Sequence, residues 1–475
     1  MGRKITIEPV TRIEGHAKVT IHLDDAGKVE RAYFHVNEFR GFEKFSEGRM
    51  FFEMPQITER ICGICPVSHH LASAKACDAV AGVKPPRTAS LLRELMHMGQ
   101  TIQSHSMHFF ELAGPDLLLG FDADPAVRNV VGVIGLDANL ALKAVNLRKY
   151  GQEVIRILGT KRVHPVFAVP GGVNAPLSRE NRDALLKPID GLIADVQLGV
   201  AVAKQWLEKN IDVVNNFAVF PSGYAGLVGP NGELELYDGE MRIVDKTGRK
   251  LAQFKPAQYL DHIAEHVEDW SYLKFPYYKA LGWPNGAYRV GPLGRLNACD
   301  SISTPLAQEE FKQFKQLNGG RPVENTLYYH YARLIEVIYA FERARQILED
   351  PDACCSEDIV TPWSTVTGEG VGCVEAPRGT LFHHYKTDEN GQLTRVNLIV
   401  ATGHNNWAMS TAVDSVAKTF IDGANLTEGQ LNRVEAAIRA YDPCLSCSTH
   451  AIGQMPLEVI VYGPGGKEVS RMTRG

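Results

Sequence analysis

Two short segments near opposite ends of the chain carry the residue types best suited to chemistry. Each holds two cysteines three positions apart, with a histidine shortly after the second cysteine. The residues are Cys62, Cys65 and His69 in the first segment, and Asp442, Cys444, Cys447 and His450 in the second. Four thiolates presented as two pairs are typical of a site for soft metal ions.

Two kinds of metal site fit these cysteines when they are considered alone. A closed, tetrahedral zinc site is the commoner fate of paired cysteines. Zinc-binding folds usually hold their pairs close in sequence, however, whereas here nearly the whole chain separates them. The pairs can therefore meet only in a core shared by both ends of the chain. A closed site also has no use for the flanking carboxylate and imidazoles, which suggest proton transfer or a second metal.

The totals describe a large globular protein of 475 residues. Hydrophobic residues make up 44%, enough for a sizeable core, and no apolar run approaches the roughly 18 residues of a membrane span. The net charge of −5 does not favour nucleic acid or an anionic membrane as a partner. Nine cysteines are few for this length and odd in number, so we expect a reducing compartment. Without the apolar segment of a signal peptide at its start, the chain is expected to be cytoplasmic.

The periodicity of apolar residues predicts an α+β fold that is mainly helical. Residues 4–36 alternate apolar and polar side chains around a turn at 24–27, which indicates a hairpin. Short strands are also expected near 226–256 and in a hairpin over 380–402. Helical spacing covers 53–62, 66–81, 88–113, 137–158, 178–217, 325–349 and 428–441. We expect one compact unit over 1–450, with a central bundle of long helices and the metal site buried between its N- and C-terminal parts.

The first cysteine pair is predicted to lie at a break between two helices. Gly63 weakens the helix that runs into Cys62, and Pro66 cannot continue that helix but suits the first turn of a new one. Near the other end, a capping box opens the predicted helix 428–441, which leads directly into the second pair. Both pairs would thus be held by helix termini.

At these residues the sequence resembles the large subunits of nickel–iron hydrogenases. Both cysteine segments match that family's two signature motifs, and three further motifs match in the right order. These motifs are Val10–His16, Arg40–Glu43 and Glu375–Gly379. Two more segments, Tyr272–Tyr278 and Leu381–Tyr385, are similar to the cytoplasmic, bidirectional NAD(P)-reducing branch of the family. The resemblance runs nearly from end to end.

The resemblance implies a nickel–iron centre held by the four cysteines. Cys62 and Cys444 would be terminal ligands of nickel, whereas Cys65 and Cys447 would bridge nickel to an iron ion that carries carbon monoxide and cyanide. His69 would donate a hydrogen bond to a bridging sulfur and tune its basicity. Without the family, His69 would be interpreted as a core histidine with partners of its own.

Further residues are implied around the open face of this centre. Arg378 would stand over the metals and polarise hydrogen or hold a base near it. Asp116 and Asp442 would be its carboxylate partners, because a buried cation needs compensation. Pro377 would shape the same face, and Thr402 would hydrogen-bond a cyanide ligand.

The resemblance also implies a proton acceptor and a second metal. Glu14 would be the first proton acceptor beside a nickel thiolate, although its sequence context alone indicates a solvated loop acid. Glu43 and His450, with a backbone carbonyl near Ile399, would hold a magnesium ion. Magnesium prefers oxygen ligands, so the imidazole leaves the identity of this metal open.

We therefore expect the catalytic subunit of an enzyme that splits H2 heterolytically and reversibly. The chain has no P-loop, no dinucleotide fingerprint and no spare cysteine cluster, so electrons must pass to another polypeptide. The family implies an iron–sulfur small subunit, with flavin- and NAD-binding subunits in the NAD(P)-reducing branch. It also implies a maturation protease that removes residues 451–475; the alternative is a C-terminal strand that stays in place. Two other functions stay open: a hydrogen-sensing regulatory subunit of the same family, and a structural zinc protein.

Overall fold

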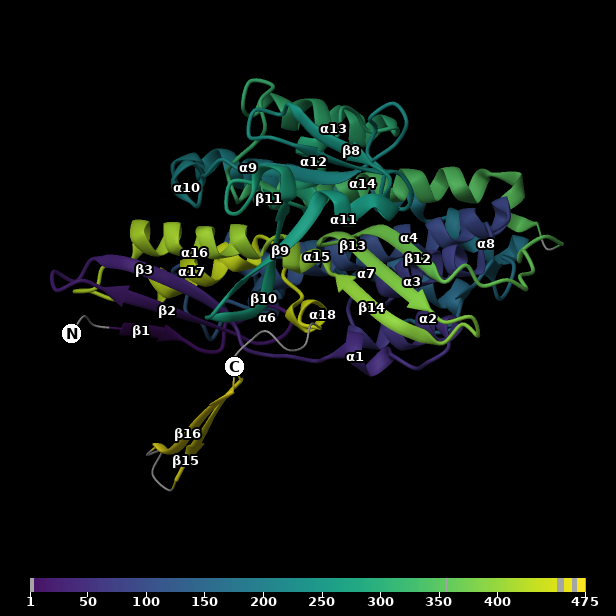
Figure 1. Ribbon diagram of the computed structural model, residues 1–475. Helices are drawn as coiled ribbons and strands as arrows, with labels where there is room; N and C mark the ends of the chain where they lie inside the picture. Colours follow the sequence, from purple (N-terminus) through teal and green to yellow (C-terminus); the bar gives the residue numbers. More distant parts are fainter. Residues whose placement is uncertain (1–3, 356, 451–456, 464–467, 475) are drawn as a thin grey trace.

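The computed structural model describes residues 4–355, 357–450, 457–463 and 468–474. Within them, long helices form the centre of the molecule and short strands form small sheets around it (Figure 1). The long helices are α3 (Pro66–Ala81), α4 (Arg87–Met107), α7 (Ala138–Gly159), α9 (Ile189–Lys209), α14 (Tyr328–Glu349), α16 (Asn406–Phe420) and α17 (Glu428–Arg439). The predicted α+β fold with a mainly helical core is confirmed.

The central bundle is built on α4, which packs against α3, α7 and α14. Glycine permits the close approach of α4 and α7, because a Cβ atom at Gly151 would collide with the carbonyl oxygen of Gly99. Helix α14 carries the predicted apolar residues, including Leu334 and Ile338, and is buried around nearly its whole circumference. The bundle therefore gives a rigid support to α3, whose N-terminus follows the first cysteine pair.

An antiparallel sheet brings the start of the chain beside its C-terminal helices. Its strands are, in order, β1 (Lys4–Ile7), β2 (Ala17–Leu23) and β3 (Val29–Val36), as residues 4–36 predict. Ile5 lies opposite Ile21, and both are buried. Helix α16 packs on β3, and α17 packs on α16 (Figure 1). The core thus joins the two parts of the chain that carry the cysteine pairs.

Two further sheets confirm predicted β segments and extend them. The first has the order β11-β6-β7-β8 and the second the order β12-β13-β14. Their strands are β6 (Gly223–Val228), β7 (Glu240–Val244), β8 (Lys250–Phe254), β11 (Tyr288–Arg289), β12 (Glu369–Ala376), β13 (Gly379–Thr387) and β14 (Leu393–Ile399). Strand β12 was not predicted, because its glycines weaken the strand signal. Gly370 and Gly372 are required there, since a Cβ atom at either position would collide with the backbone of α3.

Other predicted elements are subdivided in the structure. The stretch 178–217 forms three helices separated near Pro188 and Asn210, and the helix predicted over 88–113 ends in a π-helical turn at 108–113. A hairpin of β9 (Ile263–Glu268) and β10 (Ser271–Tyr278) was not predicted. The remaining α-helices and strands of the body are α1 (Phe42–Ser46), α2 (Met54–Thr58), α5 (Gly114–Leu118), α6 (Val130–Leu136), α8 (Arg179–Leu186), α10 (Ile211–Asn216), α11 (Tyr259–His262), α12 (Gly291–Ala298), α13 (Pro305–Gln316), α15 (Ala401–His404), α18 (Leu445–Ser448), β4 (Ala168–Val169) and β5 (Gly172–Val173).

The C-terminal tail forms a hairpin of its own. Strands β15 (Leu457–Tyr462) and β16 (Glu468–Arg474) pair antiparallel with each other, and their sheet contains no strand of the body (Figure 1). None of the helices in the described ranges is long and apolar enough to cross a lipid bilayer.

Candidate metal centre

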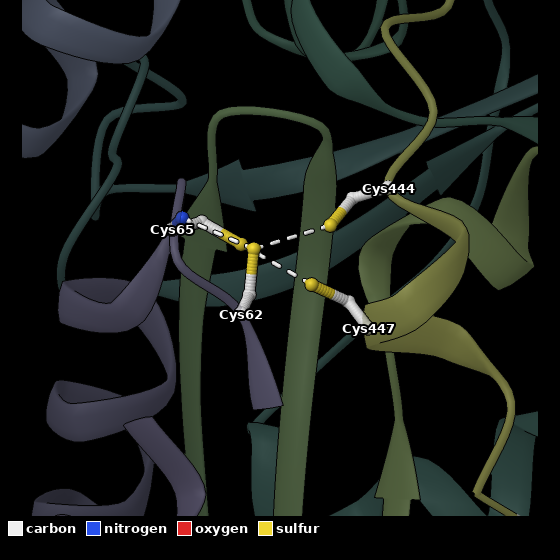
Figure 2. Close-up of side chains that lie close together, drawn as sticks. All are labelled: Cys62, Cys65, Cys444 and Cys447. Carbon is white, nitrogen blue, oxygen red and sulfur yellow. Dashed lines mark hydrogen bonds between the residues drawn. The ribbon is translucent and has the colours of Figure 1, made fainter. Parts of the chain in front are cut away.

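The four paired cysteines meet in the core and point toward one another (Figure 2). Each N-terminal thiol lies against a C-terminal one: Cys62 Sγ is 3.3 Å from Cys444 Sγ, and Cys65 Sγ is 3.4 Å from Cys447 Sγ. All four sulfurs lie within 4.8 Å of one another, and all four residues are buried. This arrangement confirms that the two ends of the chain share one thiol cluster.

The first pair lies at the predicted break between two helices. A single helical turn ends at Ile61, and α3 begins at Pro66, directly after Cys65. The backbone N–H groups of Ile64 and Cys65 donate to Cys62 Sγ at 3.2 and 3.3 Å. Such donors stabilise a thiolate, so the loop itself favours a charged sulfur.

The second pair is positioned by an irregular turn after α17. Asp442 has a φ of 53°, which places it in the left-handed region and turns the chain toward the cluster. Cys444 then forms an isolated parallel bridge with Glu14, and Leu445 N donates to the Glu14 carbonyl at 3.0 Å. The side chain of Arg40 donates to the carbonyls of Ile61 and Ser446 and so ties the two cysteine segments together. The sequence placed Arg40 in a family motif without assigning it this role.

Electrostatics favour a cation among these sulfurs. Burial raises the pKa of the Cys444 thiol, and its three thiol neighbours raise that pKa further. Burial also raises the pKa of the Cys447 thiol. Four thiolates at this spacing therefore need positive charge between them, and a metal that binds here must displace thiol protons.

Arg378 lies beside the cluster and is held by Asp442, as predicted. Its Nη2 donates to Asp442 Oδ1 at 3.0 Å, and both side chains are buried. Burial alone would lower the pKa of Arg378, but Asp442 and the nearby thiols hold it well above its ordinary value. Burial raises the pKa of Asp442 to about 6, although Arg378 opposes this. Arg378 lines a small cavity together with His69, Leu381, Val400, Thr402 and three of the four cysteines.

The structure corrects the expected partner of Asp116. Its carboxylate forms ion pairs with Arg12, Arg128 and Arg439, and no ion pair joins it to Arg378 in the described ranges. Asn432 also donates to Asp116 Oδ1 at 3.0 Å. Asp116 lies on the short helix α5, where three arginines surround its carboxylate. Sequence spacing could not assign a carboxylate to one of several arginines that meet only in the folded core.

Glu14 and Thr402 contact the cluster, and Pro377 directly precedes Arg378. Cys444 Sγ donates to Glu14 Oε2 at 3.0 Å, which places a carboxylate in direct contact with an expected terminal ligand. Thr402 Oγ1 accepts the backbone N–H of Cys444 at 2.9 Å, so its own hydrogen remains to be donated. The carbonyl of Pro377 accepts a hydrogen bond from Arg295 at 3.3 Å, which fixes the turn before Arg378.

His69 lines the same cavity and has a partner behind it. Its Nδ1 lies 3.1 Å from His383 Nε2, and burial lowers the pKa of His69 to about 4. His69 is therefore a neutral imidazole at the edge of the thiol cluster. No role was predicted for His383, although it lies in one of the segments that carried the family resemblance.

The residues predicted to bind a second metal lie near the place where α1 packs against β14. Glu43 Oε1 accepts the backbone N–H of Leu398 at 2.7 Å, and burial raises the pKa of Glu43. His450 and Ile399 line a small cavity nearby. His450 is buried, yet neither ring nitrogen has a hydrogen-bond partner in the described part of the chain. Buried imidazole nitrogens normally find partners, so this ring fits a ligand that the chain does not supply.

Comparisons with known proteins give the class of the molecule. A HoxL-like family matches residues 4–39, and the Nickel-dependent hydrogenase family matches residues 40–126 and 233–450. The β subunit of the NAD-reducing hydrogenase HoxS from Cupriavidus necator is 46% identical over 100% of both chains. A subunit of the F420-non-reducing hydrogenase from Methanothermobacter marburgensis is 46% identical over 99% of this chain and 100% of the relative.

Solved structures agree with these relatives. The crystal structure of an NAD+-reducing NiFe hydrogenase in the H2-reduced state matches with a TM-score of 0.92 and 45% identity, over 94% of this chain and 99% of that chain. The NiFeSe hydrogenase from D. vulgaris Hildenborough matches with a TM-score of 0.77 and 25% identity, over 95% and 100%. The chain therefore belongs to the nickel-dependent hydrogenase family, as a large, catalytic subunit. This confirms the resemblance seen in the sequence and favours catalysis over the sensor and zinc alternatives.

Proposed function

We propose that this chain splits H2 reversibly as the catalytic subunit of a cytoplasmic, NAD(P)-linked nickel–iron hydrogenase. The observation that carries the proposal is the cluster of four buried thiols, with Glu14 in contact with one sulfur and Arg378 lining the cavity beside three of the cysteines. Full-length similarity to the NAD-reducing hydrogenase HoxS supports the link to NAD(P).

The donor set fits nickel and an iron ion that carries carbon monoxide and cyanide. Four soft thiolates suit nickel, and Cys444 is the thiol in contact with the carboxylate of Glu14. The cavity beside Cys65 and Cys447 is lined in part by Leu381 and Val400, and the hydroxyl groups of Thr402 and Ser68 have hydrogens left to donate, which suits small diatomic ligands. When bound, this centre supplies the soft Lewis-acid and redox chemistry by which H2 is divided into protons and electrons.

The protein's own groups then handle charge and protons. Arg378 keeps a fixed positive charge at the edge of the cluster, because Asp442 compensates it. Glu14 accepts the proton of Cys444 along the 3.0 Å contact between Sγ and Oε2. Its carboxylate also lines an open surface groove with His16 and Glu38, which gives the proton a short route to water.

A second, hard cation is proposed at Glu43 and His450. The carboxylate of Glu43, the carbonyl of Ile399 and the unpartnered ring of His450 are its ligands, and magnesium is the first candidate. The cation stabilises the end of the second cysteine segment, because His450 lies three residues after Cys447.

The chain acts with other subunits. Electrons leave to an iron–sulfur small subunit, then pass through flavin- and NAD-binding subunits to NAD(P)+. This proposal is supported by the relatives, which are themselves subunits of NAD-reducing and F420-non-reducing hydrogenases.

Residues 451–475 are proposed to be removed by a maturation protease after His450. Two observations support this: the hydrogenase family match ends at residue 450, and within the described residues strands β15 and β16 pair only with each other. His450 is buried, so a continuing chain must leave the core at this point. Intact-mass measurement of active, nickel-loaded enzyme is expected to show a chain that ends at His450. Retention of Gly475 in active enzyme would overturn this proposal.

One set of measurements tests the function as a whole. The purified complex is analysed for nickel, iron and magnesium, for infrared bands of carbon monoxide and cyanide, and for H2-dependent reduction of NAD+ and NADP+. We expect nickel and iron, bands from both diatomic ligands and H2-dependent reduction of at least one nucleotide. Zinc without nickel, or dye reduction without any nucleotide reduction, would contradict the metal centre or the NAD(P) link, respectively.

A further inference from the structure

A cleft between the sheet β11-β6-β7-β8 and the helices α12 and α13 lies outside the metal centre. Its volume is about 410 Å³, which lies within the range of about 300–1,000 Å³ that is typical of small-molecule sites. Its walls are strands β7 and β8, the turn between them, the C-terminal end of α12 and the last turn of α13. Figure 1 shows α12, α13 and β8 close together. The cleft therefore has room for a bound molecule.

Positive charge predominates in this cleft. Arg242, Lys250 and Lys315 line it, and Asp300 is the one carboxylate among the described residues of its walls. Asp300 is already engaged, because Arg242 Nη1 donates to its Oδ2 at 2.7 Å. The neighbouring carboxylate of Asp245 accepts hydrogen bonds from residues of its own turn. The two lysines are thus left without an ion pair in the described part of the chain.

Lys315 is the cation whose charge is least well compensated. It lies in the last turn of α13, where a positive charge suits the helix dipole. A lysine at such a position normally extends its ammonium group into water, but Lys315 is half-buried, with Nζ 5.0 Å from the centre of the Phe311 ring. Burial lowers the pKa of Lys315, although Asp300 opposes this. Within the described residues its ammonium group makes no hydrogen bond, so its donors are available to an anion.

The charges of the cleft favour a phosphate group as this anion. Three cations against one carboxylate leave an excess of two positive charges. A phosphate group carries about −1.5 to −2 charges at pH 7, and lysine binds phosphate as a point charge. We propose that the cleft binds the phosphate group of a small molecule between Lys250 and Lys315, beside the Arg242–Asp300 ion pair. This site is independent of the hydrogenase activity proposed above.

The position of the two lysines predicts what a bound phosphate does to the protein. Lys250 is the first residue of β8, and Lys315 belongs to α13. A phosphate held by both side chains joins the sheet to the helix across the cleft. Because the ligand binds the folded state alone, it should raise Tm in proportion to its occupancy.

Calorimetric titration of the purified complex tests the proposal. The probes are inorganic phosphate and glycerol 3-phosphate, at an ionic strength held constant with chloride. We expect saturable binding of phosphate and a rise in Tm that chloride does not reproduce. Tighter binding of glycerol 3-phosphate would identify the ligand as an organic phosphate, whereas equal affinity would identify the phosphate ion itself. Absence of saturable binding for both probes overturns the proposal.

Two variants and a matched control locate the binding. Lys315→Met removes the charge but keeps the length of the side chain, so we expect Kd for phosphate to rise ~10-fold or more, as for one lost charge-assisted hydrogen bond. Lys250→Met, at an exposed position, gives the same test if Lys315→Met fails to fold. Lys312→Met is the control, because Lys312 lies one turn earlier on α13, pairs with Glu309 and does not line the cleft. Unchanged Kd in the cleft variants, or equal weakening in Lys312→Met, overturns the assignment.

Discussion

Two buried arginines a short distance apart in the core are used in opposite ways. Arg295 donates to Glu336 at 2.7 and 2.5 Å, to Glu375 at 2.8 Å, and to the carbonyls of Ala376 and Pro377. Arg378 follows directly after that turn. It has one carboxylate partner, Asp442, and a long contact of 3.5 Å to Ser104, while its Nε has no partner in the described ranges.

The difference in hydrogen-bond partners distinguishes an arginine that stabilises the fold from one that can act in chemistry. A buried charge with every donor satisfied fixes the fold and has nothing left to bind. A buried charge with donors to spare carries a cost in stability that its own fold does not offset, and such groups gather at functional sites. Arg295 therefore stabilises the turn at residues 376–377, and this turn positions Arg378 beside the thiol cluster.

Removal of one thiol from the cluster should have the largest effect on metal binding and turnover. In Cys447→Ser a soft ligand becomes a hard, weak one, so we expect loss of nickel and of all hydrogen turnover. Cys299→Ser is the control, because Cys299 is an equally buried thiol outside the cluster. Metal analysis and turnover with a redox dye check both variants. Full nickel and turnover in Cys447→Ser would remove this residue from the site.

Exchanging the two arginines for lysine tests the comparison directly. Lysine keeps the charge but loses the planar fork. We expect Arg378→Lys to retain metal while turnover falls by ~10²- to 10³-fold, the range found when a preorganised donor is lost. Arg295→Lys should instead lower Tm and leave turnover per bound nickel intact. Equal losses of turnover in the two variants would contradict the division of roles.

The proton route gives a smaller, more specific effect. Glu14→Gln keeps the size and hydrogen bonding of the side chain but cannot carry a proton, so metals should assemble while turnover falls by ~10²-fold. Hydrogen exchange with deuterated water should fall as well, whereas ortho–para conversion, which needs no proton exit, should survive better. Glu30→Gln, which changes an exposed carboxylate of β3 outside this groove, is the control. Normal exchange in Glu14→Gln would exclude this route.

The stabilising role of the Arg295–Glu336 ion pair should be visible in how protein stability depends on pH. Burial alone would raise the pKa of Glu336, but Arg295 and His105 lower it from 4.5 to about 2. Because the folded pKa is depressed, Glu336 contributes about 3 kcal/mol of stability above pH 4.5, and this is lost as pH falls toward 2. Thermal unfolding of wild type and Glu336→Gln across this range should show that wild type loses the larger amount of stability. Equal losses of stability in wild type and Glu336→Gln would contradict the stabilising role of the Glu336 carboxylate.

Local patterns predicted most of the long helices, the first sheet and the cysteine loop, because each depends on neighbouring residues, but helices α13 and α16 were not predicted. Pro66 starts α3 and the capping box of Thr427 and Gln430 starts α17, as the sequence indicated. Two other features were not predicted correctly because they depend on contacts between segments far apart in the chain. Strand β12 owes its place to glycines that fit against α3, and Asp116 takes partners that come from residues far along the chain.

The sequence by itself identified the four thiols of the cluster and the class of the protein, because both depend on residue types and their spacing along the chain. Only the tertiary structure decided which buried arginine keeps hydrogen-bond donors available for a ligand. Arg295 and Arg378 look alike in sequence, and only the arrangement of Glu336, Glu375 and Asp442 in the folded core distinguishes them. The physical reason is that a buried charge is defined by partners within a few ångströms, and these come from segments that meet only when the core closes.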